Sequence, residues 1–195
     1  MSSGMAASYP ISLEVDPAAA QNRLSVLLRI LFAIPHYVVL YLLQIALEVV
    51  TLIAWIVILI TGNYPQGMMN FAVGVLRWQV RAFGYYALLT DKYPPFSLDD
   101  VRDYPIRLNV DPQLSGRNRL TVFFRIIMII PHVIALMILG IVAYVCVVIM
   151  WIVALITGTA PAGLHDFVAN VMKWGARVQG YALLITDQYP PFQVG

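Results

Sequence analysis

Basic side chains recur at helical spacing within two apolar segments of this chain. Arg77 and Arg81 lie four residues apart, and Lys173 and Arg177 stand at the matching positions of a second, similar segment. A tryptophan stands inside each pair: Trp78 and Trp174. Cations in apolar segments are costly and usually meet an anion. The pattern fits a basic groove for an anionic lipid or substrate, or a set of headgroup anchors in an aromatic belt.

An acid and two histidines are the other candidates for chemistry. Glu48 is the one charge between residues 36 and 61, and Tyr144 is its counterpart. It can serve as a proton or cation site, or pair with a neighbouring helix or a partner subunit. His36 and His132 each follow a proline, where they can face each other across a symmetry axis or cap a helix at the interface. No carboxylate or cysteine accompanies them at ligand spacing, so we expect no metal.

The remaining polar residues favour structural roles. Asp91 and Asp187 belong to a repeated Thr-Asp-x-Tyr-Pro-Pro-Phe motif and are expected to cap a helix end and the following turn. Asp166 is an expected partner of Lys173. Cys146 is the one cysteine, and burial in an apolar helix argues against reactivity. No phosphate loop, nucleophile elbow, carboxylate pair or zinc motif is present, so we expect no enzyme and no cofactor.

A duplication positions all of these residues. Residues 9–98 recur at 104–194, from a Tyr-Pro-Ile-x-Leu-x-Val-Asp-Pro opening to the Tyr-Pro-Pro-Phe close. We expect a tail over 1–8, a first membrane repeat over 9–98, a linker over 99–103 and a second repeat over 104–195. A duplication this complete implies a pseudo-twofold pair, with any site between the copies or present twice.

Composition indicates a lipid environment. Hydrophobic residues make up 61% of the chain and charged residues 11%, against roughly 45–50% and 25% in soluble domains. The net charge of +2 gives no case for nucleic acid. Residues 1–22 lack the apolar run of a signal peptide, so we expect the first hydrophobic helix to direct membrane insertion.

Each repeat divides into four elements. Alternation over 11–15 predicts a strand, paired with its copy or with the Tyr-Pro-Pro-Phe tails. Residues 22–34 predict an amphipathic interfacial helix that ends or kinks at Pro35, with the Arg29 head group at the interface. Residues 36–61, like 132–157, are long and apolar enough to span a bilayer.

The fourth element decides the topology. Residues 66–90, like 162–186, predict an amphipathic helix that either lies in the interface, giving single spans in inverted copies, or crosses, giving hairpins in parallel copies. We favour parallel hairpins, because the strands and tails then share one compartment with most of the charge. The cations on that side are Arg23, Lys92, Arg102, Arg107, Arg117 and Arg119. The positive-inside rule then places both termini in the cytoplasm.

The fold expectation is therefore an all-α membrane protein with four membrane helices. Two tandem pseudo-symmetric hairpins, with kinked interfacial helices, carry a short extramembrane β element. The expected location is multi-pass in a bacterial inner membrane.

The two copies also resemble a known family. The run Arg29-Ile30-x(4)-Pro35-His36, then Thr61-Gly62-x-x-Pro65, then Arg77-Trp78-x-x-Arg81-x(3)-Tyr85, closing on Thr90-Asp91-x-Tyr93-Pro94-Pro95-Phe96, is similar to a bacterial membrane family catalogued as a domain of unknown function. Single-copy members resemble one half of this chain, which supports a repeat able to pair with itself. The resemblance implies a bacterial inner-membrane protein and brings no activity.

Two functions remain open from the sequence. The first is a non-enzymatic accessory or scaffold subunit that packs against other membrane subunits or against itself. The second is a transporter-like or anionic-lipid-binding protein that uses the basic residues at the repeat interface. In both, membrane lipids are expected partners.

Overall fold

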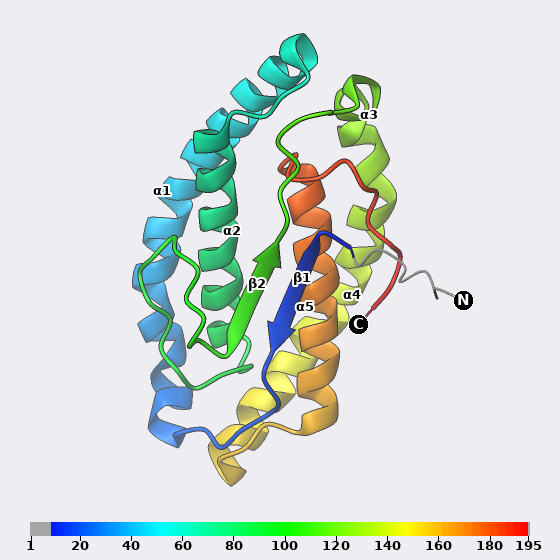
Figure 1. The fold of residues 1–195 in the computed structure, drawn as a ribbon. Coiled ribbons are helices and arrows are strands. Elements are labelled where there is room, and N and C mark those ends of the chain that lie inside the picture. The colour runs from blue at the N-terminus through cyan, green and yellow to red at the C-terminus, as the bar shows by residue number, and fades with distance from the viewer. Residues whose placement is uncertain (1–8, 195) are drawn as a thin grey trace, which may run out of the picture.

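The computed structural model describes residues 9–194, and Figure 1 shows their course. The elements in chain order are β1 (Ile11–Val15), α1 (Arg23–Thr61), α2 (Gln66–Tyr86), β2 (Ile106–Val110), α3 (Arg119–Phe123), α4 (Arg125–Thr157) and α5 (Ala162–Ala182). The protein is mostly helical, with one small sheet and two tandem repeats, as expected in outline. The expected tail over 1–8 lies outside the described residues.

The strands of the two repeats pair with each other. β1 and β2 are antiparallel, with Leu13 opposite Leu108 at the centre of the register. Both leucines are buried on one face of the sheet, as the alternation predicts. Each strand packs mainly on a helix of the other repeat, β1 on α5 and β2 on α2. The repeats are therefore interlocked through their strands.

Glycines allow this close packing. A Cβ atom at Gly180 would lie 2.2 Å from Cδ1 of Ile11, and one at Gly84 would lie 2.1 Å from Cδ1 of Ile106. The same Gly–Ile contact thus occurs twice, once for each strand. It explains why a glycine closes the polar stripe of each amphipathic helix.

The proline expected to end or kink the first helix lies inside it. Asn22 caps α1 by accepting hydrogen bonds from the N–H groups of Leu24 and Ser25, and the helix then runs through Pro35 to Thr61. Of the two expected outcomes at Pro35, an end or a kink, an end of the helix is therefore wrong. In the second repeat the break falls at Phe124, between α3 and α4, and not at the proline.

A tyrosine of the closing motif supports each proline site. Tyr93 donates to the carbonyl of Phe32 at 3.2 Å, and Tyr189 donates to the carbonyl of Met128 at 3.0 Å. Both carbonyls lie three residues before a helical proline, next to the carbonyl that loses its regular N–H partner to the proline ring. The docked tails are therefore fastened to the long helices beside the proline sites.

Each repeat is a helical hairpin, and the two hairpins are inverted relative to each other (Figure 1). The turn after α1 lies beside the start of the second repeat: the N–H of Arg117 donates to the carbonyl of Gly62 at 3.2 Å. The turn after α4 lies beside the start of the first: the N–H of Gln21 donates to the carbonyl of Gly158 at 2.8 Å. The expected parallel arrangement is therefore wrong.

Inversion also separates the cations that were expected to share one side. The Arg119 side chain lies 3.6 Å from the Cβ position of Gly62, whereas Arg23 lies 3.7 Å from that of Gly158 at the opposite end. The positive-inside rule no longer selects a side, and the assignment of both termini to the cytoplasm loses its basis.

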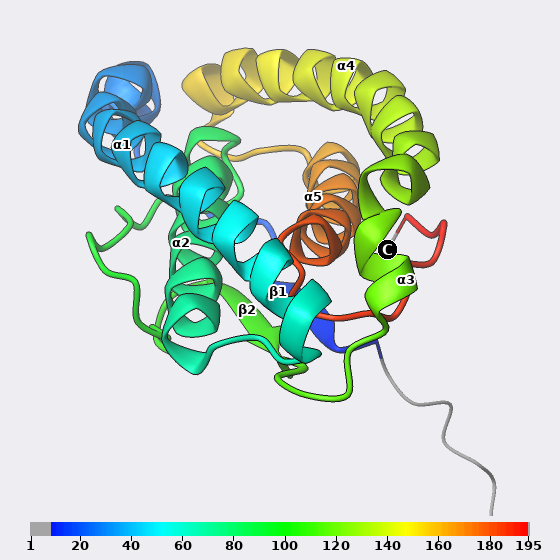
Figure 2. The same cartoon turned by 90° about the horizontal axis from the view of Figure 1, so that it is seen from above.

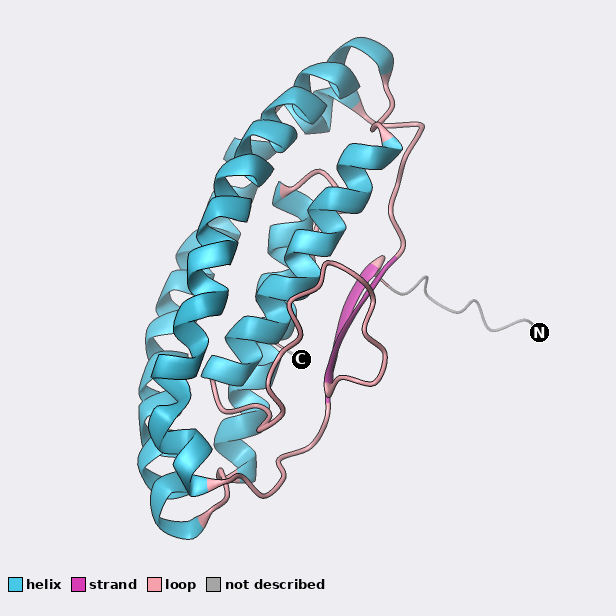
Figure 3. Ribbon diagram, turned by 90° about the vertical axis from the view of Figure 1, so that its left-hand side faces the viewer, coloured by secondary structure: helices cyan, strands magenta, loops and turns pink. Residues whose placement is uncertain are grey.

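The elements form three layers (Figures 2 and 3). α1 and α4 make one outer layer, α2 and α5 lie beneath them, and the sheet covers the far side of α2 and α5. Among the described residues, two helices, α1 and α4, are long and apolar enough to cross a membrane. Four membrane helices were expected; the shorter α2 and α5 do not meet that description.

Candidate functional site

The basic stripe of α2 faces the sheet and the segment that follows the helix. Arg81 is buried, and its guanidinium donates to the backbone carbonyls of Ser97 and Asp99, the latter at 3.0 Å. Arg77 donates to the carbonyl of Leu108 in β2 at 3.4 Å. These two cations hold the linker segment and β2 against α2.

The second basic pair holds the C-terminal tail. Arg177 donates to the carbonyl of Gln193 at 2.6 Å. Lys173 donates to Oδ1 of Asn170 at 3.1 Å and not to Asp166, so the expected ion pair between Lys173 and Asp166 is wrong. None of the four basic side chains lines either of the two cavities described for residues 9–194.

The histidines and tryptophans form a buried cluster within each repeat. Nε1 of Trp78 donates to Nδ1 of His36 at 3.1 Å, and the ring of Phe96 stacks on the imidazole at 3.9 Å. The second repeat repeats the cluster with His132, Trp174 and Phe192. The histidines therefore do not face each other across the axis. Because both tryptophans are buried, they do not form an aromatic belt.

Arg29 is also fully buried, although its head group was expected at the membrane interface. It donates to the carbonyls of Tyr85 and Thr90, both at 3.1 Å, and to the carboxylate of Asp91 at 2.6 Å. The same bonds recur in the second repeat from Arg125 to Tyr181, Thr186 and Asp187. These clamps fasten the first helix of each repeat to the end of the second.

The two aspartates cap a different helix end from the one expected. The carboxylate of Asp91 accepts from the backbone N–H of Asn22, and that of Asp187 accepts from Asn118, at the starts of α1 and α3. Their expected structural role stands as an interpretation, but the helix they cap is the first of the repeat. The sequence signal for the clamp is that both the arginine and the aspartate return in the second copy.

The second clamp contains one more cation than the first. Arg117 donates to Asp187 at 2.7 Å, where the first repeat has Gln21. Burial of Asp187 opposes ionisation, but hydrogen bonds from Arg117, Asn118 and Arg125 outweigh it and lower the pKa of this carboxyl. The aspartate therefore stays charged among its basic partners.

Glu48 begins a row of amide side chains that crosses the repeat interface. Glu48 is exposed on α1 and accepts from Nε2 of Gln44 at 3.1 Å. Gln79 of α2 donates to Gln44 at 2.8 Å, and Gln179 of α5 donates to Gln79 at 2.6 Å. Sequence analysis missed these three glutamines, because none of them is repeated in the other copy and none is charged.

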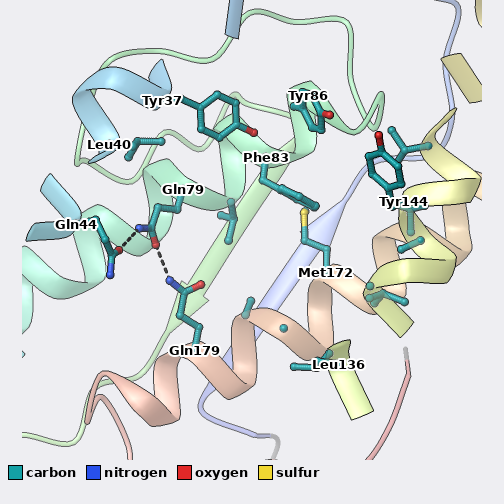
Figure 4. Close-up of a pocket in the computed structure, with 18 of the residues that line it drawn as sticks. Tyr37, Leu40, Gln44, Gln79, Phe83, Tyr86, Leu136, Tyr144, Met172 and Gln179 are labelled. Atoms are coloured by element: carbon teal, nitrogen blue, oxygen red, sulfur yellow. Dashed lines mark hydrogen bonds between the residues drawn. The ribbon is translucent and has the colours of Figure 1, made fainter. Parts of the chain in front are cut away.

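The three glutamines of this row border a cavity of about 810 Å³ between the two repeats, which we call the inter-repeat cavity (Figure 4). All four long helices line it, and most of its wall is apolar. Tyr41 and Tyr144, from α1 and α4, line it and remain 69% and 61% exposed, so the cavity opens on the α1/α4 layer. Its volume lies within the roughly 300–1,000 Å³ of small-molecule sites.

Small residues of the second repeat create this space. Gly140 and Gly175 line the cavity at positions that correspond to Gln44 and Gln79 in the first repeat. A Cβ atom at either glycine would meet nothing within 4 Å. The cavity is thus a product of the differences between the copies, and it has no symmetric twin among the described cavities.

The remaining candidates for chemistry are a metal site, the cysteine and the polar groups of the cavity. Within residues 9–194, no three His, Cys, Asp or Glu side chains gather where they can hold a metal ion. Cys146 is a free thiol buried in α4. The polar groups at the cavity are amides and phenols, which bind by hydrogen bonding.

Comparison with known proteins gives a family. The family described as a domain of unknown function, DUF4389, matches residues 23–97 and, a second time, residues 119–193. No curated protein matches the chain, and no solved structure matches it. Each matched stretch contains the helical hairpin and the Tyr-Pro-Pro-Phe close of one repeat, without its strand. Because the two matches cover most of the chain, this protein belongs to the DUF4389 family and carries two tandem copies of its domain.

Proposed function

We propose that this protein is a non-enzymatic membrane protein that binds one lipid-like molecule in the inter-repeat cavity. The proposal replaces the basic groove with an apolar site. Its location is the membrane, and the resemblance to a bacterial family favours the bacterial inner membrane.

The observation that carries the proposal is the cavity itself. Its wall combines a long apolar surface, with Phe83 and Met172 among its side chains, with three adjoining glutamines at one side and tyrosine hydroxyls elsewhere around it (Figure 4). Ligand sites typically have this composition. Because its exposed rim belongs to the most apolar helices, a molecule dissolved in the bilayer can enter without crossing water.

The amide row favours an uncharged polar group on the ligand. The three glutamines offer both N–H donors and carbonyl acceptors, and Tyr37 and Tyr86 add phenols at the same cavity. No arginine or lysine lines the cavity. A hydrocarbon chain with an ester, carbonyl or hydroxyl group therefore fits better than an anionic head group.

Photochemical labelling tests the proposal. The probe is a phosphatidylcholine with a diazirine in one acyl chain, reconstituted with the purified protein and irradiated. We expect crosslinks at residues of α2 and α5 that line the cavity, since these helices are otherwise covered. Gly175→Leu, which places a side chain in the cavity, is expected to remove these crosslinks.

A matched control lies in the same helix. Gly163 also has no neighbour within 4 Å of its Cβ position, but it does not line the cavity. Gly163→Leu should keep the crosslinks. Crosslinks confined to the outer faces of α1 and α4, or equal labelling of the two variants, contradict the proposal.

The accessory-subunit hypothesis remains a second candidate. The observation in its favour is that most exposed large hydrophobic side chains lie on α1 and α4, a surface that another membrane subunit, or a second copy, can cover as well as lipid can. Isolation in mild detergent should then bring a partner in fixed ratio. A clean monomer that retains lipid contradicts it.

A further inference from the structure

Apolar and polar surfaces lie on opposite sides of this molecule. The exposed large hydrophobic residues are concentrated along α1, from Leu24 to Ile60, and along α3 and α4, from Leu120 to Ile156. Figures 2 and 3 show these helices on one side and the sheet on the other. The molecule therefore has an apolar face and a charged face on opposite sides of its layers, and both faces run parallel to the long helices.

The sheet side carries exposed charge. Glu14 and Asp16 of the β1 segment are 56% and 48% exposed in their side chains, and both pair with Arg107 of β2. Arg102 in the linker is 77% exposed and pairs with Asp100. These groups form an exposed, charged surface on the sheet side of the molecule.

Inverted symmetry places this charged sheet halfway along the helices. The register centres on Leu13 and Leu108, and the two repeats run from this centre in opposite directions. The turn at Gly62 marks one end of the molecule and the turn at Gly158 the other. If the helices stood along the membrane normal, Glu14 and Arg107 would lie near the bilayer centre, where charged side chains are costly.

The helices are also too long for an upright arrangement. α1 has 39 residues, which at about 1.5 Å each give roughly 58 Å. A hydrocarbon core is about 30 Å thick and a whole bilayer about 40–45 Å. A helix that lies in the membrane plane has no such limit.

We propose that the protein lies flat in one leaflet, with the α1/α4 layer embedded in the acyl region and the sheet facing water. The partner of the α1/α4 surface is thus the bilayer. Arg23 and Arg119 are exposed at opposite ends of the molecule, and in this arrangement their guanidinium groups extend to the lipid headgroups. This arrangement goes beyond the proposed ligand and replaces the expected multi-pass topology.

Cysteine accessibility tests the orientation with three positions. Asn63 and Thr159, exposed in the turns at the two ends, and Ser12, exposed on the sheet, are each changed to cysteine in a Cys146→Ser background. Intact cells and inside-out vesicles are treated with a membrane-impermeant maleimide. We expect all three positions to label from the same side.

The inverted repeats make the alternative distinct. An upright protein would label at Asn63 and Thr159 from opposite sides of the membrane, and that result overturns the proposal. In a further outcome, the cysteine at position 12 is protected from the maleimide while those at positions 63 and 159 label from opposite sides. This result would show an upright protein whose sheet is covered by a partner, and it overturns the proposal as well.

Polarised infrared spectroscopy of the unmodified protein in oriented bilayers gives an independent answer. The amide I dichroism should show helix axes near the membrane plane. Helix axes near the membrane normal contradict the proposal. Both outcomes concern only the orientation of the helices. Lipid binding in the cavity is tested separately by the photochemical crosslinking experiment.

Discussion

Replacing Asp187 with alanine should destabilise this protein strongly. Its carboxylate accepts from Arg117 at 2.7 Å, from Arg125 at 2.6 Å and from the N–H of Asn118 at 2.8 Å. The side chains of Arg117 and Arg125 are 0% and 3% exposed, and that of Asp187 is 13% exposed. Alanine leaves two buried guanidiniums without a carboxylate, and breaking a buried ion pair costs about 3–5 kcal/mol.

The first repeat provides a matched comparison. Asp91 is 29% exposed in its side chain and meets one arginine, Arg29. Asp91→Ala leaves one buried guanidinium without a carboxylate instead of two, so it should cost less than Asp187→Ala, about 3 kcal/mol. Arg117→Gln gives the second clamp the residue that the first has at Gln21. In that background, the cost of Asp187→Ala should fall toward that of Asp91→Ala.

Unfolding in mixed micelles, followed by tryptophan fluorescence, measures these differences. Asp111→Ala, at an exposed site after β2, serves as a control and should change stability by less than about 0.5 kcal/mol. Equal losses for Asp91→Ala and Asp187→Ala would refute the reasoning. So would a loss for Asp187→Ala that is unchanged by Arg117→Gln.

Three further predictions concern the pH dependence of the Asp187 contribution, two helix glycines and a tyrosine of the C-terminal tail. Because the folded state lowers the pKa of Asp187, its contribution is complete above the ordinary carboxyl pKa of about 3.9 and is lost as pH falls through the lower folded value. The stability difference between wild type and Asp187→Asn should therefore shrink below about pH 4, and a constant difference contradicts this. Gly175→Ala should stabilise α5 by about 0.5–1 kcal/mol, whereas Gly84→Ala, whose Cβ meets Ile106, should destabilise by about 1–3 kcal/mol; thermal unfolding distinguishes the two signs. Tyr189→Phe removes the bond to the Met128 carbonyl and should cost about 0.5–1.5 kcal/mol; faster amide exchange near Pro131 would report it, and unchanged exchange would contradict it.

The repeat architecture could be predicted because it is local and periodic. Alternating residues in both openings predicted the strands. Because a lone strand is unstable, they were expected to pair with each other or with the Tyr-Pro-Pro-Phe tails, and the structure shows the first of these. The hairpins follow from two helices joined by a short turn at Gly62 and at Gly158. The family assignment followed from residues that return in both copies.

The relative orientation of the copies could not be predicted in this way. Two similar sequences carry no record of whether their units are parallel or inverted. Arg23 and Arg119 were counted as one cluster because each precedes the first helix of its repeat, yet they lie at opposite ends. The contacts that decide the orientation, such as that between Gln21 and Gly158, join residues far apart in the chain.

The candidate site was missed for a related reason. A basic stripe on an amphipathic helix has the same pattern whether it faces lipid, ligand or protein, and Arg81 meets backbone carbonyls of a returning segment. A search for repeated features also passes over Gln44 and Gln79, whose counterparts are glycines. The cavity depends on that asymmetry.

An experimental structure in a lipid environment tests the central claim most directly. Crystals grown from a lipidic mesophase should show elongated non-protein density in the inter-repeat cavity, entering between Tyr41 and Tyr144 and ending near Gln79 and Gln179. A cavity closed by movement of α1 against α4, with no such density, would contradict the account.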